Sequence, residues 1–89
     1  SSVLATPPNL YHWRTHAGAE VDVLLERDGI LYPIEIKLAS RPTRGDLRGI
    51  SAFRTTYPQS RIAPGLVVAP TEALQRIGEK DFALPWDWR

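Results

Sequence analysis

The sequence contains no cysteine and no methionine, and it has no long apolar run. Without cysteine, disulfide bonds and thiolate metal sites are excluded, and a reducing cytoplasmic location is expected. No stretch approaches the ~20 apolar residues of a membrane span, and no signal segment opens the chain, so we expect no membrane partner. Because methionine is missing even at position 1, we expect an excised or processed fragment.

The composition is that of one small globular domain or a piece of a larger one. Of the 89 residues, 43% are hydrophobic and 24% are charged, which is ordinary for a soluble chain. The net charge is only +1, but residues 41–61 hold five arginines against one acid, Asp46. Such a stretch can bind phosphates, and it equally describes a solvated helix face. The arginines are Arg41, Arg44, Arg48, Arg54 and Arg61.

The first half of the chain predicts a β-meander. Residues 1–10 contain two prolines and no periodicity, which indicates a linker or irregular lead-in. Strands are predicted over residues 11–15, 20–25 and 30–38, the last two joined by a tight Asp28-Gly29 turn. Pro33 lacks a backbone donor, which favours an edge or bulged position in the third strand.

The second half predicts a helix and further strands. Thr43 is a suitable N-cap, and apolar residues then recur on one helical face before Pro58 ends the helix. We expect a buried strand at residues 66–69, a short helix over residues 71–77 and a last strand at residues 82–84. The helical face consists of Leu47, Ile50, Phe53 and Tyr57.

A two-residue hairpin turn would set the register of the chemically interesting residues. Asp22 would then lie opposite Glu35, and Glu20 opposite Lys37, all on one face. Paired carboxylates repel each other unless a cation such as Mg²⁺ or Mn²⁺ lies between them. Lys37 would orient a water molecule or stabilise charge on a phosphate. The alternative is an exposed Glu20–Lys37 ion pair with Asp22 as a surface residue. The opposite, apolar face would pack on the helix; it pairs Val21 with Ile36, Val23 with Ile34, and Leu25 with Tyr32.

Asp22, the hairpin and Glu35-Ile36-Lys37 resemble the PD-(D/E)XK motif of restriction-endonuclease-like nucleases. With residues 11–25, the Phe53 helix and Leu84-Pro85-Trp86, the chain resembles an uncharacterised C-terminal domain of prokaryotic AAA-type ATPases. The resemblance implies an α/β nuclease-like domain over residues 11–89. Its core would be a three-stranded antiparallel meander followed by a helix and further strands, with the first helix of the fold missing.

The resemblance also implies roles for individual residues. Asp22, Glu35 and the carbonyl of Ile36 would bind Mg²⁺ or Mn²⁺, with Lys37 assisting catalysis and Glu20 as an auxiliary residue. Apart from the resemblance, the arginine-rich stretch predicts that Arg41, Arg44 and Arg48 contact nucleic acid. There is no phosphate-binding loop, so ATP would bind only in the missing N-terminal part. The expected partners are nucleic acid, the protein's own ATPase module and, through apolar surface left by the missing helix, a second copy of the fragment.

Three functions therefore follow as hypotheses. The first is a metal-dependent phosphodiesterase, the second a non-catalytic nucleic-acid-binding or regulatory module of the ATPase, and the third a protein-interaction domain. His12 and His16 have a helical metal-ligand spacing but lie on a predicted strand and turn, so no zinc site is expected. The tryptophans are assigned to packing, and the serines lack the partners of a hydrolase triad.

Overall fold

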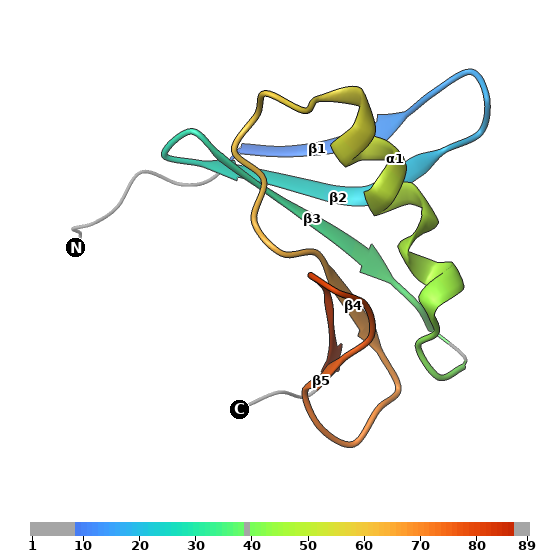
Figure 1. Cartoon of the computed structure of the whole chain (residues 1–89). Helices are drawn as coiled ribbons and strands as arrows, with labels where there is room; N and C mark the ends of the chain where they lie inside the picture. Colours follow the sequence, from blue (N-terminus) through green and yellow to red (C-terminus); the bar gives the residue numbers. More distant parts are fainter. Residues whose placement is uncertain (1–8, 39, 87–89) are drawn as a thin grey trace.

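The computed structural model describes residues 9–38 and 40–86, which form a mixed α/β domain with a six-stranded sheet in the order β1-β2-β3-β4-β6-β5 (Figure 1). Of the predicted lead-in, residues 1–8 lie outside the described residues, while Asn9 and Leu10 already belong to β1. The elements are β1 (Asn9–Arg14), β2 (Glu20–Arg27), β3 (Ile30–Ile36), the 3₁₀ helix η1 (Arg44–Leu47), α1 (Arg48–Thr56), β4 (Leu66–Ala69), β5 (Gln75–Arg76) and β6 (Phe82–Pro85).

The β2–β3 hairpin confirms the predicted turn. Asp28 and Gly29 both have positive φ, 54° and 77°, as a two-residue turn of this type requires. The strands pair from Arg27 with Ile30 as far as Val23 with Ile34, which is the predicted register. The hairpin therefore carries Asp22 and Glu35 to the same end of the sheet.

The predicted packing face of the hairpin is confirmed at Val21 but wrong for its other residues, because β2 contains a bulge. Tyr11 pairs with Leu24, but Trp13 pairs with Val21, so β2 has one extra residue between these pairs. The extra residue breaks the alternation of side chains, and Val21 and Leu24 are both buried. In β3, Pro33 is buried, whereas Tyr32 and Ile34, on the other face by alternation, are only half-buried.

Pro33 lies in an internal strand and not at an edge, but it falls at an irregularity in the pairing, where two residues between Leu31 and Ile34 stand against three between Ile62 and Leu66. β3 pairs with β2 on one side and runs parallel to β4 on the other. The N–H groups of Leu31 and Lys37 donate toward the β4 side, to Arg61 and Val68. Backbone N–H groups at every second residue of a strand point to the same side, so the Pro33 nitrogen also faces β4. It lies between the Leu31–Ile62 bridge and the first β3–β4 pair, where no backbone hydrogen bond is required. A missing donor is tolerated there.

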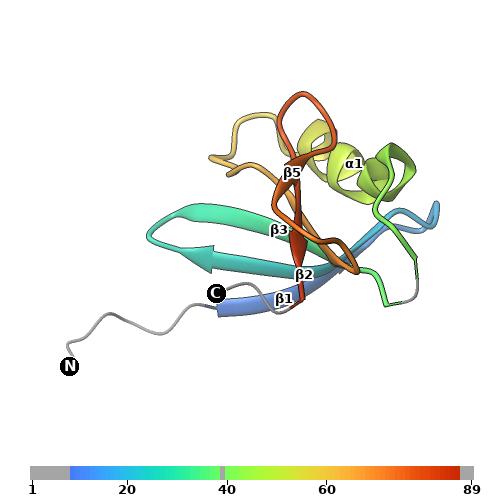
Figure 2. The ribbon, with the colours of Figure 1, turned by 90° about the horizontal axis from the view of Figure 1, so that it is seen from below.

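The β3–α1–β4 crossover places α1 on one side of the sheet (Figure 2). Leu47, Ile50 and Phe53 are buried against the sheet as the helical pattern predicts. The Trp13 ring meets Phe53 edge-on with centroids 5.2 Å apart, in agreement with a packing role. Thr43 precedes the helical segment as predicted, but its first turn, η1, is a 3₁₀ helix.

The short helix predicted over residues 71–77 is wrong. Gln75 and Arg76 form β5, which pairs antiparallel with β6, and the Ile77 N–H donates to the Asp81 carbonyl at 3.0 Å. A helix of this length has too few internal hydrogen bonds to offset its nucleation, so pairing with β6 prevails. The strands predicted at residues 66–69 and 82–84 are confirmed as β4 and β6.

Candidate functional site

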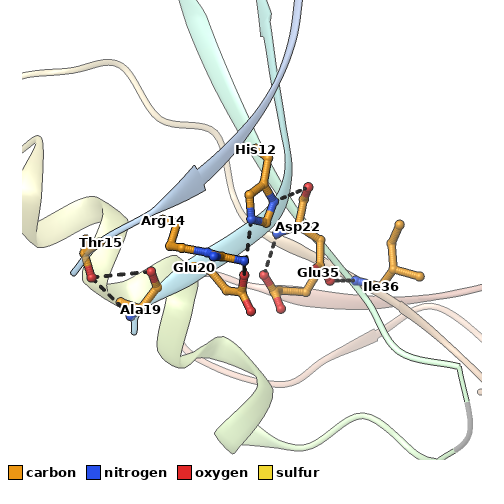
Figure 3. Close-up of polar contacts among 8 residues, drawn as sticks. All are labelled: His12, Arg14, Thr15, Ala19, Glu20, Asp22, Glu35 and Ile36. Carbon is orange, nitrogen blue, oxygen red and sulfur yellow. Dashed lines mark hydrogen bonds and ion pairs between the residues drawn. The ribbon is translucent and has the colours of Figure 1, made fainter. Parts of the chain in front are cut away.

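Asp22 and Glu35 meet where β2 and β3 diverge (Figure 3). Beyond the Val23–Ile34 pair, the backbone pairing of the two strands ends, and hydrogen bonds to the two carboxylates connect them instead. Glu35 Oε1 accepts the Asp22 N–H at 3.0 Å, and Asp22 Oδ2 accepts the Ile36 N–H at 2.9 Å. Each strand thus fixes the carboxylate of the other. The arrangement brings two acidic groups together and leaves Asp22 Oδ1 and Glu35 Oε2 outside these two bonds.

The electrostatics of Glu35 are unusual. Its pKa is raised to about 7, mainly by burial and also by the negative charges of Asp22, Glu20 and Asp46, against the hydrogen bond from the Asp22 N–H, which lowers it. All the charges that shift this pKa are therefore negative. Near neutral pH the carboxyl group is divided between its protonated and ionised forms, and a nearby cation would favour the ionised form.

Lys37, which the predicted register places opposite Glu20, is bound to Asp46, so the alternative of a Glu20–Lys37 ion pair is wrong. Its Nζ lies 2.7 Å from both carboxylate oxygens of Asp46. Asp46 also accepts the Thr43 N–H at 2.7 Å, as in a helix capping box. Burial opposes ionisation of Asp46, but the bonds from Lys37 and Thr43 outweigh it and lower its pKa.

Glu20 is paired with β1. Its Oε2 lies 3.2 Å from His12 Nε2 and 3.7 Å from Arg14 (Figure 3). The other ring nitrogen of His12, Nδ1, lies 3.2 Å from the Asp22 carbonyl. This imidazole therefore bridges Glu20 and the backbone of Asp22. His16, in the turn after β1, is exposed and makes no recorded side-chain bond within the described part of the chain.

Small residues keep a hollow open beside Glu35. It measures about 570 Å³ and lies between the turn before β2 and the start of the helix, with Glu20, Glu35, Asp46 and Arg48 among its walls. A Cβ added to Gly49 would lie 1.8 Å from the Glu20 carbonyl oxygen, so the helix approaches β2 closely only because residue 49 is glycine.

The three arginines expected to contact nucleic acid do not share one pocket. Arg48 lines the hollow beside Glu35, whereas Arg44 and Arg41 line two others. All three side chains are exposed.

Two residues of the site, Asp46 and His12, are not predicted by the sequence patterns. Asp46 stands three positions after Thr43 and is the one acid among five arginines, a pattern that could have marked it. In the sequence, His12 stands out only through its spacing from His16, which is a zinc-ligand spacing on a helix. Its contact with Glu20 depends on the β1–β2 bulge, which sequence periodicity does not reveal.

The site can be tested for its fit to a metal ion. The described residues contain no group of three or more His, Cys, Asp or Glu side chains arranged to hold one. Mg²⁺, however, needs only one or two carboxylates and otherwise keeps its water ligands. Asp22 and Glu35 supply two, and Asp22 Oδ1 and Glu35 Oε2 lie outside the two reciprocal hydrogen bonds. The donor set fits a hydrated magnesium or manganese ion.

Together, the fold and site define a mixed α/β domain with two carboxylates joined at the end of a β-hairpin. The chain belongs to the family described as "Domain of unknown function (DUF4143)", whose profile matches residues 2–88. Within the described ranges, no helix has the length and apolar character needed to cross a membrane.

Two mycobacterial proteins are similar to almost the whole chain. They are the uncharacterized protein Mb2031c of Mycobacterium bovis and the uncharacterized protein Rv2008c of Mycobacterium tuberculosis. Each is 30% identical over 86 residues, which cover 97% of this chain but 18% of the relative. The chain thus spans less than a fifth of these relatives. No solved structure matches it.

Proposed function

We propose that this domain is a metal-dependent phosphodiesterase of the PD-(D/E)XK, restriction-endonuclease-like type, acting on nucleic acid. The observation that carries the proposal is the reciprocal bonding of Asp22 and Glu35, which holds two carboxylates together at the end of the hairpin. The antiparallel β1–β2–β3 meander and the β3–α1–β4 crossover agree with the implied core.

A divalent cation would relieve the electrostatic cost of this arrangement. Asp22, Glu35 and the Ile36 carbonyl would hold Mg²⁺ or Mn²⁺, which when bound supplies a polarised water and neutralises phosphate charge. Lys37 would face the developing negative charge, with Asp46 fixing the position of its ammonium group. Arg48 is exposed in the hollow beside Glu35 and would bind a neighbouring phosphate there. Arg41 and Arg44 would lie on the flanking surface.

The test is cleavage of plasmid and single-stranded RNA in Mn²⁺ or Mg²⁺. The protein would be assayed alone and within its full-length parent. Asp22→Asn and Glu35→Gln should lower the rate by at least about 100-fold, because each removes a ligand charge. Glu79→Gln removes an exposed carboxylate elsewhere and is the matched control. Cleavage by the parent that is no faster than that of its Asp22→Asn variant contradicts the proposal.

We also propose that the domain is attached to an AAA-type ATPase and acts in the cytoplasm. The motif combination supports this, and the much greater length of the mycobacterial relatives leaves room for such a module. Full-length protein should then hydrolyse ATP through a site outside these residues. A parent without ATP hydrolysis or ATP binding would contradict the attachment.

The alternative is a non-catalytic nucleic-acid-binding or regulatory module. The Lys37–Asp46 pair favours it, because the ammonium group is bound to Asp46 and not to Asp22 or Glu35. In that case nucleic-acid binding should survive Asp22→Asn, weaken with salt, and fall on Arg44→Ala or Arg48→Ala. Co-purification with the ATPase without nucleic-acid affinity would instead indicate a protein-interaction domain.

A further inference from the structure

The C-terminal end of α1 borders a second concave site that shares no wall residue with the hollow beside Glu35. This cavity measures about 630 Å³, within the ~300–1,000 Å³ range of small-molecule sites. The residues that matter for its chemistry are three cations, two aromatic rings and a hydroxyl: Arg54, Arg76, Lys80, Tyr57, Phe82 and Ser60. No carboxylate is among the described residues that line it.

The charge of this cavity is only partly compensated. Arg54 pairs with Asp81, which is 3% exposed and also accepts the Gly65 N–H at 2.7 Å. Arg76 and Lys80 are exposed, and neither makes an ion pair within residues 9–38 and 40–86. Two positive charges therefore border the cavity without a partner there, which favours an anionic occupant.

Aromatic groups beside these cations favour a planar occupant. The Arg76 guanidinium carbon lies over the Phe82 ring, 5.8 Å from its centroid, so a planar cation and an aromatic ring are paired at the cavity. Tyr57 is 42% exposed, but its ring is held against Phe53 with centroids 5.1 Å apart. A heterocyclic ring can stack on either surface.

We propose that this cavity binds a phosphate monoester that carries a nucleobase, with the phosphate at Lys80 and Arg76 and the base against Tyr57 or the Arg76–Phe82 stack. An inorganic phosphate would fill only a small part of the volume and would leave the aromatic surfaces unused. The chemistry is shared by a free nucleotide and by the 5′-phosphorylated end of a nucleic-acid strand. The site lies beyond the proposed phosphodiesterase centre and does not depend on it.

The test is a titration of the protein with AMP, followed by NMR. AMP should shift the resonances of Tyr57 and Phe82 and should bind at least about tenfold more tightly than adenosine or inorganic phosphate, a difference of ~1.4 kcal/mol. Arg76→Gln combined with Lys80→Gln should weaken binding about tenfold or more. Arg27→Gln, which removes one charge at the β2–β3 hairpin and outside this cavity, should leave it unchanged.

A short oligonucleotide, with and without a 5′-phosphate, distinguishes the two sources of the ligand. Tighter binding of the phosphorylated strand than of AMP would assign the site to a strand end, and the reverse order would assign it to a free nucleotide. The proposal is overturned if AMP binds no better than phosphate, if Arg27→Gln weakens binding as much as the double substitution, or if Tyr57 and Phe82 do not respond. The circular dichroism spectrum of each variant confirms that it is folded.

Discussion

At the scale of single residues, Glu35 has the most informative environment. It is a partly buried carboxyl group surrounded by Asp22, Glu20 and Asp46, and its pKa rises from its ordinary value of 4.5 to about 7. Because the folded protein holds this proton more tightly than the unfolded chain, this group destabilises the fold as the pH rises from about 4.5 to about 7. The destabilisation is complete above that interval.

Replacing Glu35 by glutamine should therefore stabilise the protein at pH 8. After allowance for solvent screening we expect a gain of about 1 kcal/mol in the free energy of unfolding, vanishing near pH 4.5. Urea denaturation without divalent cations measures it, with Glu79→Gln as the exposed control. A difference that does not change with pH would show that Glu35 ionisation is not the cause. If the cation site exists, Mg²⁺ should reduce the gain by stabilising the parent.

At the scale of secondary-structure elements, the contact between α1 and β2 determines the shape of the site. Gly49 lies directly against the Glu20 backbone, and this contact brings the start of the helix over Glu35. Glycine lowers helix propensity by about 1 kcal/mol relative to alanine. In this position, close packing outweighs that cost.

Gly49→Ala should therefore destabilise the fold, although alanine is the better helix former. A Cβ 1.8 Å from the Glu20 oxygen forces the helix and strand apart, and we expect a loss of about 2 kcal/mol by thermal or urea denaturation. Gly45→Ala is the matched control, since its Cβ would meet nothing nearer than 3.5 Å. Equal stability of the two variants would contradict the close approach of α1 to β2.

Element boundaries differ in how far the sequence could predict them. The Asp28-Gly29 hairpin and its register follow from local turn geometry, and they correctly bring Asp22 and Glu35 together. The bulge in β2 depends on how β1 pairs with it, so the packing face of the hairpin could not be inferred. Lys37 pairs with Asp46 because folding brings η1, which carries Asp46, next to the end of β3. This is a tertiary contact that sequence periodicity does not encode.

At the scale of the whole molecule, Asp81 connects segments that are distant in sequence. Its carboxylate binds Arg54 of α1 and the Gly65 N–H just before β4.

On the opposite side of the sheet from α1, no described helix covers the strands (Figure 2). Four apolar residues there are half-buried: Val23, Leu25, Tyr32 and Ile34. The predicted association of two copies therefore stays a prediction, and this face is its natural location.

Asp81→Asn should cost about 2–3 kcal/mol of stability at pH 7. It leaves Arg54 without its counter-charge, and we reduce the usual cost of breaking a buried pair because the Arg54 side chain is 21% exposed. Burial opposes ionisation of Asp81, but bonds from Arg54 and Gly65 outweigh it and lower its pKa. Its contribution should disappear as the pH falls below about 3.8, the ordinary value. Urea titrations at pH 7 and 3 measure both effects, and a loss of equal size at the two pH values would contradict them.

The sequence by itself determined the local features of this protein: the hairpin turn, the meander, the apolar face of the helix and the meeting of Asp22 with Glu35. These features depend on interactions between residues close in sequence or on one tight turn, so the pattern of residue types is sufficient to predict them. Only the tertiary structure decided which face of the hairpin is buried, that Lys37 pairs with Asp46, and that β5 replaces a predicted helix. Each of these depends on a partner strand or turn brought close by folding, where packing and charge pairing outweigh local preference.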